Sequence, residues 1–175
     1  MGSCAFQECK AKVIFESGSK LVTIGTRSFK DFAGTIEIPS TVETIGYEAF
    51  ADASGVVTFA PNSTLRNIKQ SAFERYPFEI VVPPSVRVIG PQAFAGASKV
   101  RLAPGSQLET LGSHTFSCFW KWKLLDCAPD PVTVPETVRK IHQAAFWHYP
   151  GNVMFEGGSK IELIGQNAFA DYAGM

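Results

Sequence analysis

The chain has 175 residues, of which 45% are hydrophobic, and its 16 basic and 16 acidic side chains cancel at pH 7. This balance removes the general electrostatic argument for a nucleic acid or an anionic membrane surface as partner. No run approaches the ~18 consecutive apolar residues of a membrane-spanning helix, and the N-terminus lacks the apolar core of a signal peptide.

An apolar pattern that ends in phenylalanine recurs at least seven times along the chain. One type of repeat begins with a triplet such as Val-x-Phe, continues through Leu and Ile-Gly, and covers residues 13–29, 57–73, 100–116 and 153–169. A shorter type begins with a triplet such as Ile-x-Ile followed by Pro, and alternates with the first over residues 36–50, 80–94 and 132–146. Each copy holds too few apolar residues to fold alone, so we expect the copies to stack into one solenoid.

Each copy predicts the same short elements in the same order. The triplets predict strands at residues 13–15, 36–38, 57–59, 80–82, 100–102, 132–134 and 153–155, with the middle residue facing solvent. A proline after the triplet has no N–H for a ladder and should end the strand. The Ile-Gly segment predicts a second short extended stretch, closed by a glycine that can take a positive φ. The final Phe should lie in a single turn and fill the interior, and little α-helix is expected because no window has a sustained 3.6-residue period.

The expected core has two aromatic positions per repeat. The first is the final Phe of each copy, which we expect to form an internal column. The second lies three residues later, where small and aromatic residues tend to alternate, as successive rungs interdigitate; its occupants are Cys9, Phe32, Ala53, Tyr76, Ala97, Phe119, Tyr149 and Tyr172.

The repeat covers the chain as a single continuous domain over residues 1–175, and it is cut within a repeat at both ends. We therefore expect a segment of a longer protein. An insertion at residues 118–131 adds about nine residues to one repeat. Cys118 and Cys127 bracket that insertion, so a disulfide between them is one alternative, although we favour free thiols.

Motifs that would indicate catalysis, a cofactor or a metal are not found in the sequence. There is no paired Cys-x-x-Cys, no phosphate loop, no dinucleotide motif and no arrangement typical of a catalytic triad. Asn62-Ser63-Thr64 has the form of an N-glycosylation sequon. Because Asn62 aligns with Gly18, Gly105 and Gly158, a left-handed turn explains it without a glycan.

Two sets of solvent-facing residues follow from the repeat. The second stretch presents charged residues that pair across neighbouring repeats (Glu43 with Arg66, Arg87 with Glu109, Arg139 with Glu162), which we interpret as solvated surface. The first stretch presents a weakly charged set that suits protein binding better. Its members are Ile14, Glu37, Thr58, Val81, Arg101, Thr133 and Met154.

The insertion is the second candidate for a binding site. It carries Phe119, Trp120 and Trp122, and Trp147 and His148 follow the Phe of the next repeat. Insertions in repeat proteins often project from the binding face, and tryptophan is enriched in interface hot spots. The alternative is that Trp120, Trp122 and Leu124 fold back and cover the side of the solenoid.

The alternating pattern resembles the BspA-type (Treponema-type) leucine-rich repeat, from Phe6 to Tyr172. Residues 80–94, Ile-Val-Val-Pro-Pro-Ser-Val-Arg-Val-Ile-Gly-Pro-Gln-Ala-Phe, are a close match to one such repeat. The family's cysteine after Ala-Phe is kept at Cys9 and replaced elsewhere by Ala, Phe or Tyr. The resemblance implies a curved leucine-rich-repeat solenoid in surface or secreted proteins that adhere to host matrix proteins or to other cells.

The sequence thus favours a non-enzymatic protein-interaction or adhesion segment of a larger surface or secreted protein, without a cofactor and without membrane insertion. An intracellular, cytoplasmic scaffold or a secreted effector module is the first alternative. A structural spacer stalk is the second.

Overall fold

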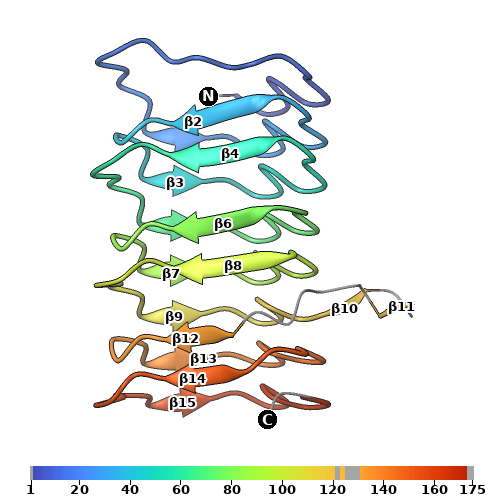
Figure 1. Cartoon of the computed structure of the whole chain (residues 1–175), viewed down its shortest axis with the longest axis vertical. Helices are drawn as coiled ribbons and strands as arrows, with labels where there is room; N and C mark the ends of the chain where they lie inside the picture. The colour runs from blue at the N-terminus through green and yellow to red at the C-terminus, as the bar shows by residue number, and fades with distance from the viewer. Residues whose placement is uncertain (1, 121–122, 125–130, 173–175) are drawn as a thin grey trace.

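The extended segments of each repeat form short strands that lie above their counterparts in the neighbouring repeats, so that the chain winds into a β-solenoid (Figure 1). The computed structural model describes residues 2–120, 123–124 and 131–172. We call each turn of the solenoid a rung. Within the described residues there is no helix, and hence none that could cross a membrane.

The second extended stretches form one continuous parallel sheet along the stack. It has seven strands, which pair in the order β1 (Thr23–Ile24), β3 (Thr44–Ile45), β5 (Asn67–Ile68), β7 (Val88–Ile89), β9 (Thr110–Leu111), β13 (Lys140–Ile141) and β15 (Leu163–Ile164). Corresponding residues of successive repeats face each other in register, for example Ile45 with Ile24 and with Ile68. The insertion between β9 and β13 therefore does not interrupt this sheet.

The triplets form the other set of strands, and these pair two by two. The pairs are β2 (Thr35–Ile38) with β4 (Val56–Phe59), β6 (Glu79–Val82) with β8 (Lys99–Leu102), and β12 (Val132–Val134) with β14 (Val153–Phe155), all parallel. The strand predicted at residues 13–15 is reduced to a single bridge between Val13 and Ile36. The burial pattern of β2 and β6 alternates exposed and buried, as the triplets predicted.

Proline explains why the strands formed by the triplets pair two by two and do not form one continuous sheet. In each pair the residue after the later strand donates its N–H to the earlier strand: Ala60 to Ile38 at 2.9 Å, Ala103 to Val82 at 3.1 Å and Glu156 to Val134 at 3.0 Å. The corresponding residue after the first strand of each pair is Pro39, Pro83 or Pro135, which has no N–H to give to the strand before it. The two alternating types of repeat thus set which of these strands pair.

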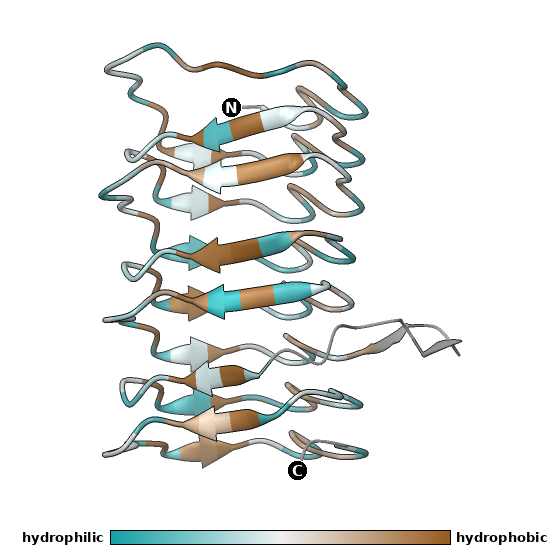
Figure 2. Ribbon diagram, viewed as in Figure 1, coloured by the Kyte–Doolittle hydropathy of each residue, from teal (hydrophilic) through white to brown (hydrophobic). Residues whose placement is uncertain are grey.

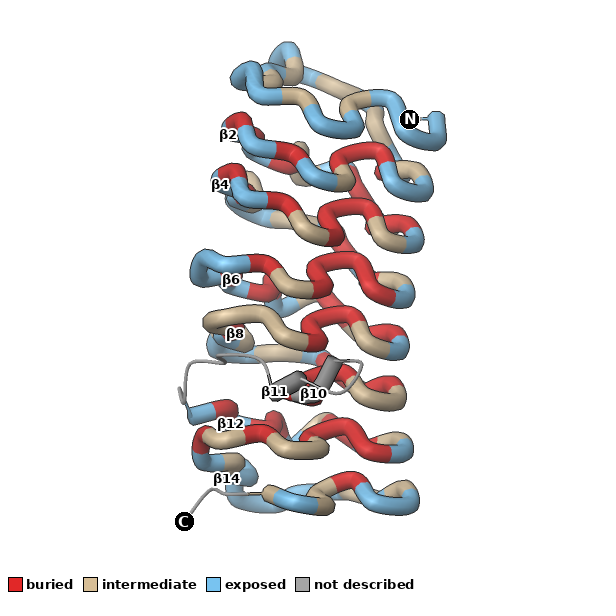
Figure 3. Tube along the Cα trace, turned by 90° about the vertical axis from the view of Figure 1, so that its right-hand side faces the viewer, coloured by how far each residue is buried: buried red, intermediate tan, exposed pale blue. Residues whose placement is uncertain are grey.

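The final Phe residues form an uninterrupted internal column, as predicted. Their rings are stacked nearly parallel with centroids 5.1–5.9 Å apart, in the order Phe6, Phe29, Phe50, Phe73, Phe94, Phe116, Phe146 and Phe169. Phe6 and Phe169, at the two ends, are half-buried, whereas the six rings between them are buried. The position three residues later also lies in the core, where Phe32 and Tyr76 pack edge-on against the column. Figure 3 shows the buried residues running through the stack.

The turn around each Phe alternates bonds within the rung and bonds to the next rung. At Phe50, the N–H groups of Glu48, Phe50 and Asp52 donate to the next rung at 2.7–3.0 Å. The N–H groups between them close turns inside the rung, as from Ala51 to the carbonyl of Glu48. This alternation needs a left-handed residue two positions before and two positions after the Phe, here Glu48 (φ 50°) and Asp52 (φ 58°). The strain of non-glycine residues in this region is offset by the inter-rung bonds.

The Ile-Gly glycines are not in the left-handed region, contrary to the prediction. At Gly112 a Cβ atom would lie 2.5 Å from the backbone of Gly90 in the preceding rung, so glycine is needed there for close approach. Gly55, before β4, is tighter still, with a Cβ atom 2.2 Å from the Gly34 carbonyl oxygen. The prediction for the other turn is confirmed, since Asn62 has φ 57° and its counterpart Gly18 has φ 80°.

Truncation of a ring in the middle of the column tests the stack. Phe94→Ala should lower the free energy of unfolding by about 3–5 kcal/mol, because Phe94 is buried and has a ring on either side. Phe6→Ala should cost clearly less, because Phe6 is half-buried and stacks on one side in the described chain. Urea unfolding followed by circular dichroism measures both, and equal losses at the two positions would contradict the stack.

Close rung spacing predicts that Gly55→Ala destabilises the protein by about 1–3 kcal/mol, because the new methyl group meets the Gly34 carbonyl. Gly157→Ala is the control, since a Cβ atom there meets nothing within 4 Å. In thermal unfolding, Gly55→Ala should therefore have a lower Tm than Gly157→Ala. A Gly55→Ala protein as stable as Gly157→Ala would mean that the rungs are not so closely spaced.

Candidate interaction surface

We call the strands formed by the triplets (β2, β4, β6, β8, β12 and β14) the outer strands. Their outward side chains form a regular surface along the stack, which we call the strand face. Its predicted residues are all exposed: Ile14, Glu37, Thr58, Val81, Arg101, Thr133 and Met154. Large apolar side chains are prominent among them, with Ile14 exposed to 73%, Met154 to 49% and Val81 to 44%. Figure 2 shows the mixed hydropathy of these strands. The structure therefore presents the apolar ladder to solvent.

Register brings the predicted contact residues together in adjacent pairs. Val81 on β6 lies directly opposite Arg101 on β8, and Thr133 on β12 lies directly opposite Met154 on β14. The Arg101 guanidinium is 2.8 Å from the Glu79 carboxylate, in an exposed ion pair. Arg101 is therefore neutralised by its own strand neighbour, which leaves the apolar side chains as the distinctive part of the face.

The strand face is hollowed at two adjacent places near its N-terminal half. A hollow of about 400 Å³ lies between residues 12–15 and β2 and is lined by Ile14 and Glu37. A groove of about 490 Å³ lies between β4 and β6 and is lined by Phe59 and Val81. Thr58 on β4 lines both, so the two hollows lie side by side along the strand face, and the second of them lies where β4 and β6 do not pair.

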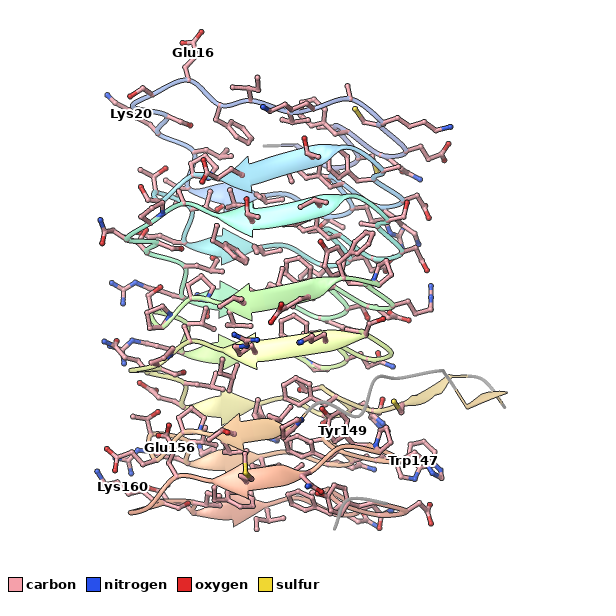
Figure 4. The ribbon with its side chains drawn as sticks, viewed as in Figure 1. Glu16, Lys20, Trp147, Tyr149, Glu156 and Lys160 are labelled. Carbon is pink, nitrogen blue, oxygen red and sulfur yellow. The ribbon has the colours of Figure 1, made fainter. Side chains whose placement is uncertain are left out.

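Trp147 lies instead on the turn edge, the side of the stack formed by the Phe-containing turns (Figure 4), and His148 is the next residue in the same turn. The Trp147 Nε1 donates to the Asp171 carboxylate at 3.1 Å, and the His148 Nε2 is 3.5 Å from the same carboxylate. His114 packs edge-on against Trp147 at 5.8 Å, and its burial lowers its pKa. The site thus acquires Asp171 and His114, which the sequence analysis missed.

The insertion begins beside this group, as the N–H of Cys118 donates to the Trp147 carbonyl at 3.1 Å. It contains an antiparallel pair of strands, β10 (Phe119–Trp120) and β11 (Lys123–Leu124), which extends away from the stack (Figure 1). Trp122 lies outside the described residues, and so do the side chains of Phe119, Trp120 and Leu124. Whether these side chains fold back or contact a partner stays a prediction.

The cysteine interpretation needs one correction. Cys118 is buried and disulfide-bonded, and it is not the free thiol that we favoured. Cys127, its predicted partner in the alternative, lies outside the described residues. Cys4 and Cys9 are free, and Cys9 packs against the core as expected.

The charged ladder of the second stretch forms cross-rung pairs at two of the three predicted places. Arg87 pairs with Glu109, and Arg139 pairs with Glu162 at 2.5 Å. Between Glu43 and Arg66 the described structure contains no ion pair. Exposed pairs of this kind contribute little to stability, and they leave this surface largely self-satisfied.

A further polar ladder on the turn edge was not predicted, although the repeat register contained it. Residues two positions before and after each Phe align from rung to rung, and several pair. Arg27 binds Glu48 through two bonds of 2.9 Å, and Arg75 binds Asp52 through two bonds of 2.6 Å. Arg75 also bonds Glu74 at 2.7 Å. Opposite charges at aligned positions of neighbouring rungs, as at Arg27 and Glu48, were the signal.

Glu74, which bonds Arg75 of this ladder, is nearly inaccessible, at 6% exposure. Its burial raises the pKa of its carboxyl, against the lowering effects of the Ser71 hydrogen bond and of Arg75. Glu48 differs, since hydrogen bonding to Arg27 lowers its pKa. The described residues contain no cluster of three metal-ligating side chains, and we interpret the ladder as structural.

Comparison with known proteins gives one family and one similar structure. The family model of the BspA type leucine rich repeat region matches residues 1–121 and 78–173, in six copies. The crystal structure of the pneumococcal vaccine antigen PcpA is similar with a TM-score of 0.60 and 24% sequence identity over 97% of this chain. This chain spans 45% of the length of that chain, and the likeness at this identity concerns the fold. Among curated proteins no match was found.

The buried Glu74 carboxylate makes a specific pH dependence testable. Because its folded pKa is raised, the ionised group costs stability at neutral pH, and the cost disappears as the pH falls through the folded pKa to the unfolded one. Glu74→Gln removes this cost while Arg75 keeps its bonds to Asp52.

Glu74→Gln should therefore raise the free energy of unfolding relative to wild type by more at pH 7 than at about pH 4, near the unfolded pKa of a glutamate. Urea unfolding at the two pH values measures this difference. A constant difference would show that Glu74 titrates alike in the folded and unfolded states.

Proposed function

Because the chain belongs to the BspA type leucine rich repeat family, we propose that it is a non-enzymatic protein-binding and adhesion segment of a larger protein that is secreted or held at the cell surface. Its partner in this proposal is a protein of the extracellular matrix or of another cell. The similarity in fold to a pneumococcal vaccine antigen supports the surface setting as an analogy.

The observation that carries the proposal is the strand face. Its side chains are held at regular intervals by the paired outer strands, and the apolar ones are exposed although the rest of the rung is well packed. Exposed apolar groups that lie near each other are typical of protein interaction sites, and here Val56 on β4 and Val81 on β6 are exposed to 48% and 44% on neighbouring strands. On the seven-stranded sheet, part of the exposed surface is already occupied by the ion pairs Arg87–Glu109 and Arg139–Glu162, and no groove of comparable apolar lining is found there among the described residues, so the strand face is the better candidate.

The turn edge around the insertion forms a second part of the proposed site. Trp147 and His148 are half-buried beside the origin of the insertion, which itself carries Phe119, Trp120 and Trp122. Tryptophan contributes large contact area at low entropic cost, which suits an interface. In this proposal the insertion extends the binding surface beyond the regular rungs.

Two matched substitutions test the strand face. Met154 on the strand face and Val22 on the opposite side are exposed to 49% and 50%, so Met154→Arg and Val22→Arg introduce the same charge at equal exposure. Against a panel of purified extracellular matrix proteins, Met154→Arg should weaken binding about tenfold or more, as expected for an interface contact, and Val22→Arg should change it less than about twofold.

The measurement is biolayer interferometry on proteins whose circular dichroism matches wild type. Equal effects of Met154→Arg and Val22→Arg would count against the strand face, and no binding to any panel member would favour a spacer stalk. With a bound partner, oxidative footprinting should show Trp120, Trp122 and Trp147 protected. Tryptophans that are already unreactive in the free protein would exclude the insertion from the site.

A further inference from the structure

The outer ladder is open between β4 and β6, in the middle of a well-formed part of the solenoid. β4 pairs with β2 and β6 pairs with β8, but no ladder joins β4 to β6 within the described residues. The seven-stranded sheet is continuous through the same rungs, since β5 pairs with both β3 and β7. The opening is therefore confined to the strand face.

The direction of the backbone groups at this opening follows from the bonds on the other side of β4. Val56 and Ala60 donate to the carbonyls of Gly34 and Ile38, on the side of β2. Because successive residues of a strand direct their N–H and C=O groups to opposite neighbours, Val57 and Phe59 direct theirs toward β6. These groups have no strand partner there.

The first of these open positions is already filled by a phenol. The Tyr76 hydroxyl lies 3.0 Å from the Val57 N–H, which donates to it, and 3.0 Å from the Gly55 carbonyl, to which it donates. The first of these two bonds recurs in the last rung, where the Val153 N–H donates to the Tyr172 hydroxyl at 2.7 Å. A tyrosine hydroxyl therefore completes an unpaired outer strand in this fold.

The same pair of backbone groups recurs two residues further along β4. There the Phe59 N–H and the Val57 carbonyl stand in the relation that the Val57 N–H and the Gly55 carbonyl have to Tyr76. The structure gives neither group a partner among the described residues. Pro83, which follows β6, cannot close the ladder at this end because it has no N–H. The second position is left open.

The open position faces the groove of about 490 Å³ between β4 and β6. Apolar side chains predominate in its lining, among them Phe59, Val81, Pro83 and Pro84, which suit the faces of an aromatic ring. Glu79 is the charged residue of the lining, and it is paired with Arg101. A neutral aromatic group with a hydroxyl matches these features better than an anion or a cation does.

We propose that the groove between β4 and β6 binds an exposed tyrosine side chain of a protein partner, with its hydroxyl bridging the Phe59 N–H and the Val57 carbonyl as Tyr76 bridges the pair before them. The inference rests on the proposed function, because it names one contact of the protein-binding strand face. In this proposal the unpaired edge between β4 and β6 selects partners that present a phenol at the contact.

The test uses two small probes and nuclear magnetic resonance of the ¹⁵N-labelled whole chain. N-acetyl-tyrosinamide should cause saturable shifts of the Phe59 and Val81 amide signals. N-acetyl-phenylalaninamide, which lacks the hydroxyl and both of its hydrogen bonds, should bind at least about fivefold more weakly, the factor expected for a single net hydrogen bond. Val81→Arg, at the groove, should abolish the shift at Phe59, whereas Val88→Arg on β7 (exposed to 37%) should leave it unchanged.

Each outcome bears on the proposal. Equal affinity of the two probes, shifts confined to other parts of the chain, or an unchanged response in Val81→Arg would overturn it. Both substitutions are at exposed positions, so folding should be retained and is checked by the rest of the spectrum. N-acetyl-tyrosinamide needs no natural partner, so its binding to the groove and the binding of the matrix-protein panel are independent results. Either can be positive when the other is negative, and the two proposals are therefore tested separately.

Discussion

Stacking of each rung on the next is the interaction on which the whole structure depends. A single rung offers two short strands and one turn, which cannot enclose an apolar interior. In the stack, the Phe rings lie 5.1–5.9 Å apart in one column, and the turn backbone around each ring donates alternately within the rung and to the next. Each rung therefore buries its apolar side chains against the same neighbour that accepts its backbone hydrogen bonds. The end rungs of the described chain have one such neighbour and gain less from both.

The alternation of two repeat types then shapes the surface. A proline after every second outer strand leaves that strand without a ladder to the one before it, while the other sheet stays continuous. The outer strands consequently form pairs with open edges between them, and the groove beside Val81 lies at such an edge. The residue that ends a strand in the sequence thus also decides where the strand face is hollowed.

Much of this architecture could be predicted because it follows from period and side-chain type. The Phe column, the outward ladder from Ile14 to Met154 and the left-handed turn at Asn62 each depend on local alternation or alignment. The prediction of a positive φ for the Ile-Gly glycines was wrong. These glycines allow close approach of backbones in neighbouring rungs, and the distance between rungs cannot be read from the sequence of one repeat. The turn-edge pairs such as Arg75 with Asp52 were missed because the register aligns these positions but does not show that the left-handed turn brings the two side chains together.

Native-state hydrogen exchange of the turn amides tests the central claim most directly. The N–H groups of Phe50, Phe73 and Phe94 donate to the next rung, so they should exchange slowest, with protection declining toward Phe6 at one end and Phe169 at the other. Such a gradient is expected when each rung is stabilised by its neighbours. Fast exchange at the central Phe amides, or equal protection from end to end, would contradict a stack held together rung by rung.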